Sequence, residues 1–342
     1  MPSQQSSFSG RRTASIDHVF IAAIDVASVG PSAKPHPCTH AYSSPERFTP
    51  RRRTVLPASS TRWLPLTRTP AAAGAASASA MTNGRSLNLG WRAVIDLHSH
   101  VLPGVDDGVR TMRESLELLR AAHDDGTSRL AATPHVREDY PTTAREMELR
   151  HAELCGAARE AAIPVEVLPG GELDLGYAAE LDDDELRRFG LGGNPALLLL
   201  EFPYLGWPLQ LPDFVFDLQL RGFRVVLAHP ERNVDVQQEP ERLRPLVDSG
   251  VVVQLTAASL DGRLGGGPRR AARQLLDARL AHLVASDAHA PDVRSAGLSE
   301  AAAAVGGRAL ARWLTDDVPA ALLDGRELPE RPEPPRRRLL RR

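Results

Sequence analysis

From Ala93 onward the sequence alternates between short apolar runs and longer amphipathic stretches, a pattern that few folds satisfy. Seven runs rich in Val, Leu and Ile are separated by stretches whose apolar residues recur at helical spacing. Strands buried on both faces read as continuous apolar runs, and helices connect parallel strands, so the alternation predicts an α/β fold with a parallel sheet. The expected strands are residues 93–98, 129–135, 164–173, 196–204, 224–232, 251–259 and 282–289.

Two parallel architectures are compatible with this order of elements, a (β/α) barrel and an open doubly wound sheet. A doubly wound sheet that binds dinucleotides carries a G-x-G-x-x-G turn after its first strand, and no such turn follows residue 98. We therefore expect a barrel, whose strands all end at the same face. The expected helices are residues 111–126, 143–162, 211–221, 240–249, 268–280 and 296–315.

Extensions are predicted on both sides of this region. Residues 1–92 are rich in Ser, Pro, Ala, Thr and Arg and show no strand or helix periodicity, so we expect a disordered segment. A targeting segment fits poorly because Asp25 interrupts its apolar run, and a translation start at Met81 is the other explanation. We expect the folded domain at residues 93–328 and a flexible Pro/Arg-rich tail at residues 329–342, with no apolar run long enough to span a membrane.

Charge and cysteine content argue against two classes of function, nucleic-acid binding and cysteine-dependent catalysis. Residues 93–342 contain 30 Arg and 40 Asp or Glu, and this acidic balance disfavours nucleic acid as a partner. The two cysteines, Cys38 and Cys155, form no disulfide framework, which indicates a cytoplasmic location. Neither cysteine is followed by arginine at the spacing of a C-x5-R loop, so a cysteine-dependent tyrosine phosphatase is excluded.

His, Asp or Glu residues, which commonly bind metal ions, stand at the ends of six of the seven expected strands. In a barrel these strand ends converge at one mouth, where such enzymes build their sites. His98 and His100 are two residues apart, as are Asp287 and His289, so each pair points to one side of its strand. With Asp107 from the first loop, the candidate ligands are His98, His100, Asp107, His135, Glu172, Glu201, His229, Asp287 and His289.

Taken singly, each motif has an ordinary structural explanation. A lone H-x-H is often accidental, a Glu after a leucine run can pair with a cation, and S-D-A-H can cap a helix. Together these groups are costly to bury at one mouth unless metal ions compensate their charge. Five His, two Asp and two Glu without a thiolate suit Mn²⁺, with iron or Zn²⁺ as alternatives, and nine ligands imply two or three ions. We assign structural or exposed roles to the remaining histidines of the domain, His123, His151 and His282.

The segments HSHVLPGVDDG, TPH, GGE, LLEF, AHPER and SDAH carry a family resemblance through their order and spacing. Over residues 93–325 the chain resembles the PHP (polymerase and histidinol phosphatase) superfamily, and within it the CpsB/CapC/YwqE-type tyrosine-protein phosphatases of bacterial capsule and exopolysaccharide clusters. The resemblance implies a distorted (β/α)7 TIM-like barrel, the PHP fold, with a manganese-dependent centre. It also implies a partner, the phosphotyrosine tail of a bacterial tyrosine kinase, and a role in regulating polysaccharide synthesis.

The resemblance also implies a role for each candidate residue. Three ions would be held, in turn, by His98, His100 and Asp287; by Glu201 and His229, with Glu172 bridging to the first ion; and by Asp107, His135 and His289. Arg232 and Arg294 match the family's phosphate-binding arginines. The family's T-P-H-H motif reads TPHV here, so a polar contact is lost at Val136 or moves to Arg137.

Three functions are compatible with these residues. A metal-dependent protein-tyrosine phosphatase fits because a phenolate, with a pKa of about 10, leaves with little protonation. A small-molecule phosphatase of the histidinol-phosphate type, or another phosphoesterase such as a nuclease, is the alternative. Short loops after the strands favour a mouth open to a protein tail, and the acidic domain disfavours a nuclease. A non-catalytic metal-binding scaffold predicts missing ligands, and none is missing. The oligomeric state stays undetermined.

Overall fold

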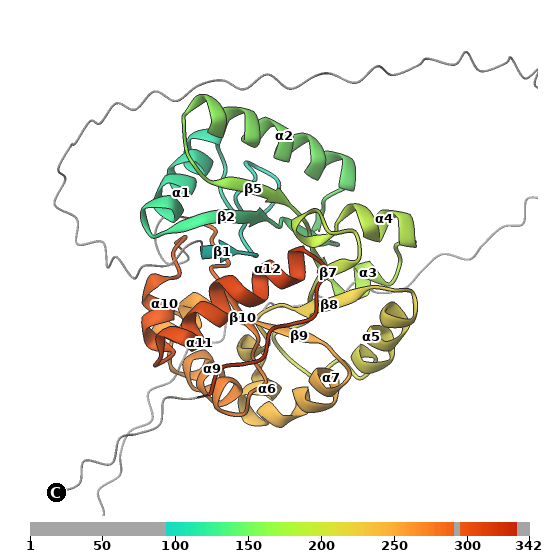
Figure 1. The fold of residues 1–342 in the computed structure, drawn as a ribbon. Coiled ribbons are helices and arrows are strands. Elements are labelled where there is room, and N and C mark those ends of the chain that lie inside the picture. The colour runs from blue at the N-terminus through green and yellow to red at the C-terminus, as the bar shows by residue number, and fades with distance from the viewer. Residues whose placement is uncertain (1–93, 291–294, 334–342) are drawn as a thin grey trace, which may run out of the picture. The chain divides into compact units, whose positions relative to one another are not determined.

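The computed structural model describes residues 94–290 and 295–333, which form a mixed α/β structure built on two sheets, the larger of them curved (Figure 1). The N-terminal extension predicted over residues 1–92 and most of the predicted C-terminal tail lie outside these ranges. Within the described ranges, no helix combines the length and apolar character that crossing a membrane requires.

The strands pair into two sheets, which are parallel except for one edge. One sheet has the order β1-β2-β5 and the other has the order β10-β9-β8-β7-β6-β3-β4, in which β4 alone runs antiparallel to its neighbour. The strands are β1 (Val94–Asp96), β2 (Thr127–Ala132), β3 (His135–Arg137), β4 (Tyr140–Pro141), β5 (Glu166–Pro169), β6 (Glu172–Asp174), β7 (Leu197–Glu201), β8 (Arg224–Leu227), β9 (Val252–Thr256) and β10 (Leu283–Ala285).

Two of the expected strands are broken in the middle. The run expected at 129–135 gives β2 and then β3, interrupted at Pro134, which has no N–H to donate to a ladder. The run expected at 164–173 gives β5 and then β6, and the break falls at Gly170 and Gly171. A Cβ on Gly171 would lie 2.8 Å from the Phe189 ring, so a side chain at that position would clash.

The segments after β1 and β10 are also paired. Ser99 and Ala288 form an isolated parallel bridge, and the Asp287 N–H donates to the His98 carbonyl at 2.9 Å. On the other side, the Thr133 N–H donates to the Ser99 carbonyl at 2.8 Å. The first and last strands of the fold are therefore joined beyond their carboxyl ends.

Helices flank both sheets. α1 and α2 lie along the three-stranded sheet, and α5, α6, α7 and α9 lie along the outside of the other sheet (Figure 1). α1 begins after Thr111 because a capping box forms there, in which Thr111 and Glu114 bond to each other's backbone N–H. The α-helices are α1 (Met112–Asp124), α2 (Ala144–Glu160), α3 (Leu175–Ala178), α4 (Asp183–Arg188), α5 (Leu211–Leu220), α6 (Val234–Gln238), α7 (Arg244–Asp248), α8 (Ala257–Asp261), α9 (Gly266–Asp277), α10 (Ser299–Ala304), α11 (Arg308–Arg312) and α12 (Val318–Leu323). The 3₁₀ helices are η1 (Leu191–Gly193), η2 (Pro230–Arg232) and η3 (Pro240–Leu243), and η4 (Trp313–Asp317) is a π-helix.

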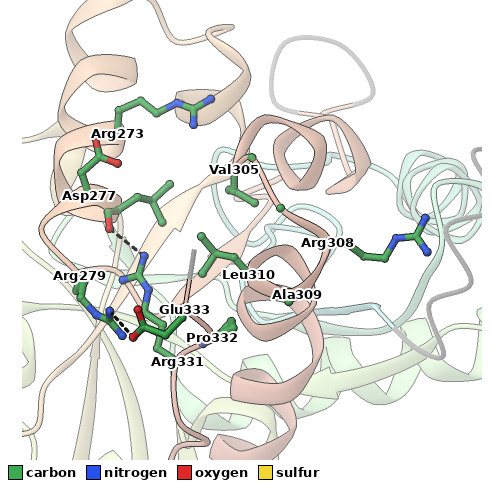
Figure 2. Close-up of a pocket in the computed structure, with 13 residues that line it drawn as sticks. Arg273, Asp277, Arg279, Val305, Arg308, Ala309, Leu310, Arg331, Pro332 and Glu333 are labelled. Atoms are coloured by element: carbon green, nitrogen blue, oxygen red, sulfur yellow. Dashed lines mark hydrogen bonds and ion pairs between the residues drawn. The ribbon is translucent and has the colours of Figure 1, made fainter. Parts of the chain in front are cut away.

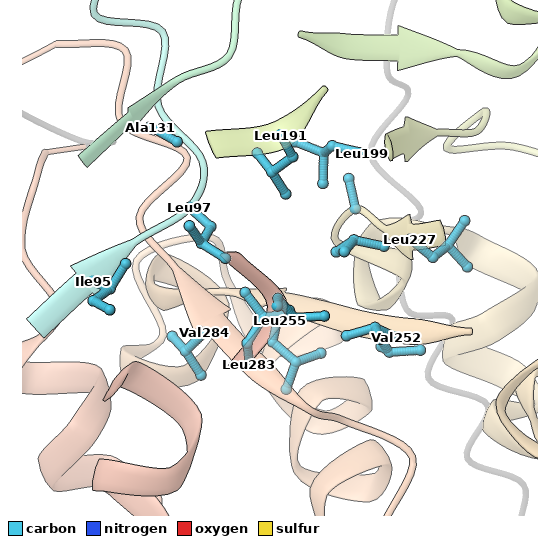
Figure 3. Close-up of a cluster of buried hydrophobic side chains, with 14 of the residues drawn as sticks. Ile95, Leu97, Ala131, Leu191, Leu199, Leu227, Val252, Leu255, Leu283 and Val284 are labelled. Carbon is cyan, nitrogen blue, oxygen red and sulfur yellow. The ribbon is translucent and has the colours of Figure 1, made fainter. Parts of the chain in front are cut away.

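The core consists of apolar side chains that the strands turn toward one another. Figure 3 shows Ile95, Leu199, Leu227 and Leu255, from four different strands, gathered with their neighbours between the sheets. All four are at most 2% exposed. Because strand after strand contributes to this cluster, the strands are held in register and their carboxyl ends are brought together.

Shortening a core side chain should cost stability. Leu255→Ala is expected to lower the free energy of unfolding by about 2–5 kcal/mol, because Leu255 is fully buried and leaves a cavity. Leu149→Ala is the matched control, since Leu149 on α2 is 57% exposed, and a change within about 0.5 kcal/mol is expected. Urea unfolding followed by circular dichroism measures both, and equal losses would contradict the assignment of the core.

Three of the first residues of the predicted tail, 331–333, lie against the end of α9 (Figure 2). Arg331 donates to the Leu276 carbonyl at 2.8 Å, and Arg279 lies 3.1 Å from Glu333. A cavity of about 530 Å³ lies between this segment, α9 and α11. α9 leads into the amino end of β10. The contact between the tail and α9 therefore lies at the amino end of that strand, away from its carboxyl end.

Candidate metal centre

All nine candidate ligands predicted from the sequence lie together, at strand ends or in the segments that follow. Their ligand atoms form four overlapping groups, and within each group the atoms lie within 4.8 Å of one another. The groups are His98, His100 and Asp287; His98, Glu172 and His229; His135, Glu172 and Glu201; and His100, Asp107, His135 and His289. Because members are shared, the four groups make one connected cluster.

The two histidines after β1 are fixed through their Nδ1 atoms. His98 Nδ1 lies 3.1 Å from Gln254 Oε1 in β9, and His100 Nδ1 lies 2.6 Å from Asp106 Oδ2. An amide oxygen and a carboxylate only accept, so both Nδ1 atoms donate. In the neutral imidazoles both Nε2 atoms then carry lone pairs, and they lie only 3.2 Å apart. Two facing lone pairs do not stabilise each other, whereas a cation between them would use both, so this pair fits a metal ion.

Glu172 lies at the centre of the cluster. It is fully buried at the start of β6. Its Oε2 lies 3.2 Å from His98 Nε2 and 3.3 Å from His100 Nε2. The same oxygen lies 2.9 Å from His135 Nδ1, and Oε1 lies 2.8 Å from His229 Nε2. One carboxylate thus reaches four imidazoles, which is the geometry of a bridging ligand.

A second set of contacts surrounds Asp107, the one ligand candidate that is not buried. Its Oδ1 lies 3.2 Å from His289 Nε2 and 3.5 Å from His135 Nε2. His289 Nδ1 lies 2.9 Å from the Asp287 carbonyl oxygen, so Nδ1 donates and Nε2 is turned toward Asp107. The loop after β1 therefore returns a carboxylate to the open side of the cluster.

The backbone is strained at two of the candidate ligands. His229 has a φ of 31° and Asp287 a φ of 52°, in the left-handed region that side chains other than glycine rarely adopt. Such positions cost about 1–3 kcal/mol each and concentrate at functional sites. In both cases the chain turns sharply at the end of a strand, β8 or β10, and the turn brings the side chain into the cluster.

Burial and mutual repulsion perturb the titration of the cluster. Burial and the charge of Glu172 raise the pKa of Glu201 to about 7. Burial, together with the charge of Arg232, lowers the pKa of His229 to about 4. Burial opposes the ionisation of Glu172, but the charge of His98 and its neighbours holds the pKa of Glu172 well below its usual range. The imidazoles around Glu172 thus favour its ionised form, and divalent cations would supply the same compensation.

Arg232 borders the cluster at the end of η2. Its Nη1 lies 2.6 Å from Asp287 Oδ2, and its guanidinium carbon lies 4.5 Å from the centre of the Tyr204 ring. The Tyr204 ring centre lies 5.9 Å from that of His229. The planar, permanently charged guanidinium of Arg232 thus lies beside the candidate metal ligands, where it can donate hydrogen bonds to an anionic oxygen.

Two further arginines, Arg294 and Arg137, were considered at the site, and the structure describes only Arg137. Arg294 lies outside the described residues. Arg137, the alternative polar contact expected from the sequence, places Nη1 3.4 Å from Glu201 Oε2. A second cationic side chain therefore reaches the cluster from β3.

Comparison with known proteins gives the family of the chain. Residues 94–317 match the model of the family described as capsular polysaccharide synthesis, CpsB/CapC. The chain belongs to the CpsB/CapC family. The tyrosine-protein phosphatase YwqE of Bacillus subtilis is 34% identical over 255 residues, which are 72% of this chain and 98% of YwqE. The putative tyrosine-protein phosphatase CapC of Staphylococcus aureus is 30% identical over 57% of this chain and 77% of its own length.

A solved structure agrees with this family. It comes from a study of YwqE from Bacillus subtilis and CpsB from Streptococcus pneumoniae, described there as unique metal-dependent tyrosine phosphatases. The TM-score is 0.65 at 31% sequence identity, and the match covers 70% of this chain and 98% of that chain. The mixed α/β fold with its curved sheet is therefore the fold of a CpsB/CapC relative.

Three residues that touch the cluster of this CpsB/CapC protein were not predicted from the sequence. Asp106 binds His100, although D-D spacing alone does not say which aspartate turns inward. Gln254 binds His98, and its signal is a lone amide in the apolar run VVVQLT. Tyr204 contacts Arg232 and carries no recognisable motif.

Cys155 lies in α2, and burial raises the pKa of its thiol. A nucleophilic cysteine needs the opposite shift, toward the thiolate. The structure of this CpsB/CapC protein therefore agrees with the exclusion of cysteine-based catalysis at this residue.

Removing the amide that orients His98 should weaken metal binding. Gln254→Leu is expected to lower metal affinity about 10- to 100-fold, because His98 Nδ1 loses its acceptor and the ring is no longer fixed. Gln254→Glu keeps the acceptor, and Gln254 Nε2 has no hydrogen-bond partner among the described residues, so affinity close to wild type is expected. Titration of metal-stripped protein with Mn²⁺ measures both variants. Equal affinities of Gln254→Leu and wild type would show that this contact does not orient the ligand.

Proposed function

We propose that this chain is a metal-dependent protein-tyrosine phosphatase, a phosphoric monoester hydrolase whose catalytic domain spans residues 93–328. The observation that carries the proposal is the convergence of nine His, Asp and Glu side chains, with ligand atoms within 4.8 Å in each group, in a member of the CpsB/CapC family. The named relatives YwqE and CpsB are tyrosine-protein phosphatases. The substrate is phosphotyrosine on a bacterial tyrosine kinase, and the family's connection to capsular polysaccharide synthesis supports this choice.

The two sheets together form one distorted (β/α)7 barrel in this proposal. The breaks between β2 and β3 and between β5 and β6 pass each of these strands from one sheet to the other. The bridge between Ser99 and Ala288 supports closure between β1 and β10. Seven strands, counted this way, follow one another around a ring with their carboxyl ends at the metal cluster.

The cluster holds two or three ions in this proposal, with Mn²⁺ preferred and iron or Zn²⁺ as alternatives. Imidazole and carboxylate donors without a thiolate support this choice. The ligand sets are His98, His100 and Asp287; Glu172, Glu201 and His229, with Glu172 bridging to the first set; and Asp107, His135 and His289. When bound, the ions supply Lewis acidity that activates water and stabilises negative charge.

The protein's own groups bind and orient the substrate. Arg232 donates hydrogen bonds to the non-bridging oxygens of the phosphate and stabilises the charge that develops on them. Arg294, which lies outside the described residues, is the second phosphate-binding arginine of the proposal. The phenolate of tyrosine needs little protonation as it leaves, so no buried acid has to be reserved for it.

Metal restoration tests the proposal. We expect the full-length protein, stripped with EDTA, to be inactive and to recover activity with Mn²⁺. Zn²⁺, Mg²⁺ and Fe²⁺ are compared with Mn²⁺ on a phosphotyrosine peptide, a phosphoserine peptide and histidinol phosphate. Recovery on phosphotyrosine alone is the expected result. A preference for histidinol phosphate would assign the chain to the small-molecule branch, and inactivity with every ion would contradict catalysis.

A further inference from the structure

Exposed apolar side chains are concentrated in one part of the described structure. Seven large apolar side chains are exposed in the described residues, and one of them, Leu149, lies on α2. Leu205 and Leu209 are the most exposed, at 75% and 85%. The other six are Tyr204, Leu205, Leu209, Phe216, Leu220 and Val234, in the loop between β7 and α5, on α5, and at the start of α6. We name Leu205 and Leu209, which lie in the loop between β7 and α5, the apolar rim.

The apolar rim is continuous with the metal cluster through Tyr204. The Tyr204 ring faces the guanidinium of Arg232 and the imidazole of His229. The next residue, Leu205, begins the rim. The Val234 N–H donates to the Tyr204 carbonyl at 2.9 Å, which ties the loop to the segment that carries Arg232. The exposed leucines therefore begin one residue from a side chain that contacts the site.

Hydrogen bonds hold this loop in a defined position. Asn233 Nδ2 donates to the Pro203 carbonyl at 2.7 Å and to the Gly206 carbonyl at 2.9 Å. Asn233 directly follows Arg232, so one residue sets the loop against the phosphate-binding arginine. Gly206 has a φ of 79°, which lets the chain turn between Leu205 and Leu209. Hydrogen bonds thus fix the loop that carries Leu205 and Leu209, and both side chains are exposed to solvent.

We propose that the apolar rim is the docking surface for the polypeptide that carries the phosphotyrosine, and that it contacts apolar residues beside that phosphotyrosine. The inference rests on the proposed function. A phosphate held at Arg232 directs the tyrosine ring, and then the residues beside it, away from the cluster. Exposed apolar side chains grouped beside an active site are typical of a binding surface. The rim's continuity with the mouth favours the substrate polypeptide as its occupant.

Two peptides and one small substrate test this surface in the full-length, Mn²⁺-loaded protein. One phosphotyrosine peptide carries leucines on both sides of the phosphotyrosine, the second carries serines there, and p-nitrophenyl phosphate has no flanking residues. We expect a KM at least about tenfold lower for the leucine peptide than for the serine peptide, because apolar surface is buried on binding. The double variant Leu205→Ser with Leu209→Ser is expected to lose that difference. Its kcat/KM for p-nitrophenyl phosphate is expected to stay within about twofold.

Leu149→Ser is the matched control, because it removes an exposed leucine from α2, and it is expected to keep the peptide preference. Size-exclusion chromatography with light scattering accompanies the assays. If the double variant lowers the oligomeric mass while both peptides keep their KM values, the rim is an interface between copies of this chain and the inference is overturned. A wild-type enzyme that hydrolyses p-nitrophenyl phosphate but treats both peptides alike overturns the docking surface and leaves the phosphatase intact. If the wild-type enzyme hydrolyses none of the three substrates, both the docking surface and the proposed phosphatase activity are overturned.

Discussion

Glu172→Gln is expected to lower phosphatase activity by at least about a thousandfold and to reduce the metal content of the protein. The Glu172 carboxylate reaches the nitrogens of His98, His100, His135 and His229 within 3.3 Å. The amide keeps the shape of the side chain but loses the negative charge that a bridge between cations requires. The kcat on a phosphotyrosine peptide and the metal bound per chain, measured by mass spectrometry, check the prediction.

Glu166→Gln is the control for the loss of one carboxylate. Glu166 begins β5, so it lies at the opposite end of the broken strand whose second half begins with Glu172. Its side chain is 61% exposed and pairs with Arg129 at 3.1 Å. We expect this variant to keep both rate and metal. A Glu172→Gln protein that is folded, fully loaded and active would show that Glu172 is not a ligand.

Arg232→Ala is expected to lower kcat/KM for phosphotyrosine about 10²- to 10³-fold while the protein keeps its metal, since a preorganised donor to the phosphate is lost. Metal should be retained because Arg232 is itself a cation that pairs with Asp287 at 2.6 Å. Removing it takes away a positive charge that competes with the metal ion for the Asp287 carboxylate. Arg232→Lys keeps the charge but not the planar fork, and an intermediate rate is expected. Steady-state kinetics with metal analysis measures all three proteins.

Arg242→Ala is the control for this series, because Arg242 is surface-exposed and pairs with Glu239 at 2.7 Å. It should leave kcat/KM unchanged. Loss of metal in Arg232→Ala would assign a structural role to the arginine in place of phosphate binding. An unchanged kcat/KM would remove Arg232 from the site.

The sequence predicted where the strands lie better than where they end. The apolar run 251–259 was expected to be one strand, but β9 ends at Thr256 and residues Ala257–Asp261 form α8. Nothing in the local composition marks that boundary, because small and apolar residues continue across it. Pro134 does carry a signal, the absence of an N–H, and the strand expected at 129–135 breaks there.

The candidate ligands were predictable for a topological reason. Parallel strands deliver their carboxyl ends to one edge, so residues placed after several strands converge whatever the details of packing. The partners that orient them were not predictable, because each depends on tertiary contacts. Gln254 and His98 are 156 residues apart, and only the pairing of the strands shows that they meet. Asp106 and Asp107 are adjacent, and only the loop conformation separates the residue that binds His100 from the ligand candidate.

The pairing beyond β1 and β10 joins segments from the two ends of the folded domain's sequence. Asp96 and Ser286, which hydrogen-bond to each other, are 190 residues apart, so the ribosome must complete nearly the whole domain before they can meet. A nascent chain that stops before Asp287 has β1 but not the partner segment that follows β10. A cation held by His98, His100 and Asp287 would link these two segments, so this ligand set is complete only after Asp287 has been synthesised.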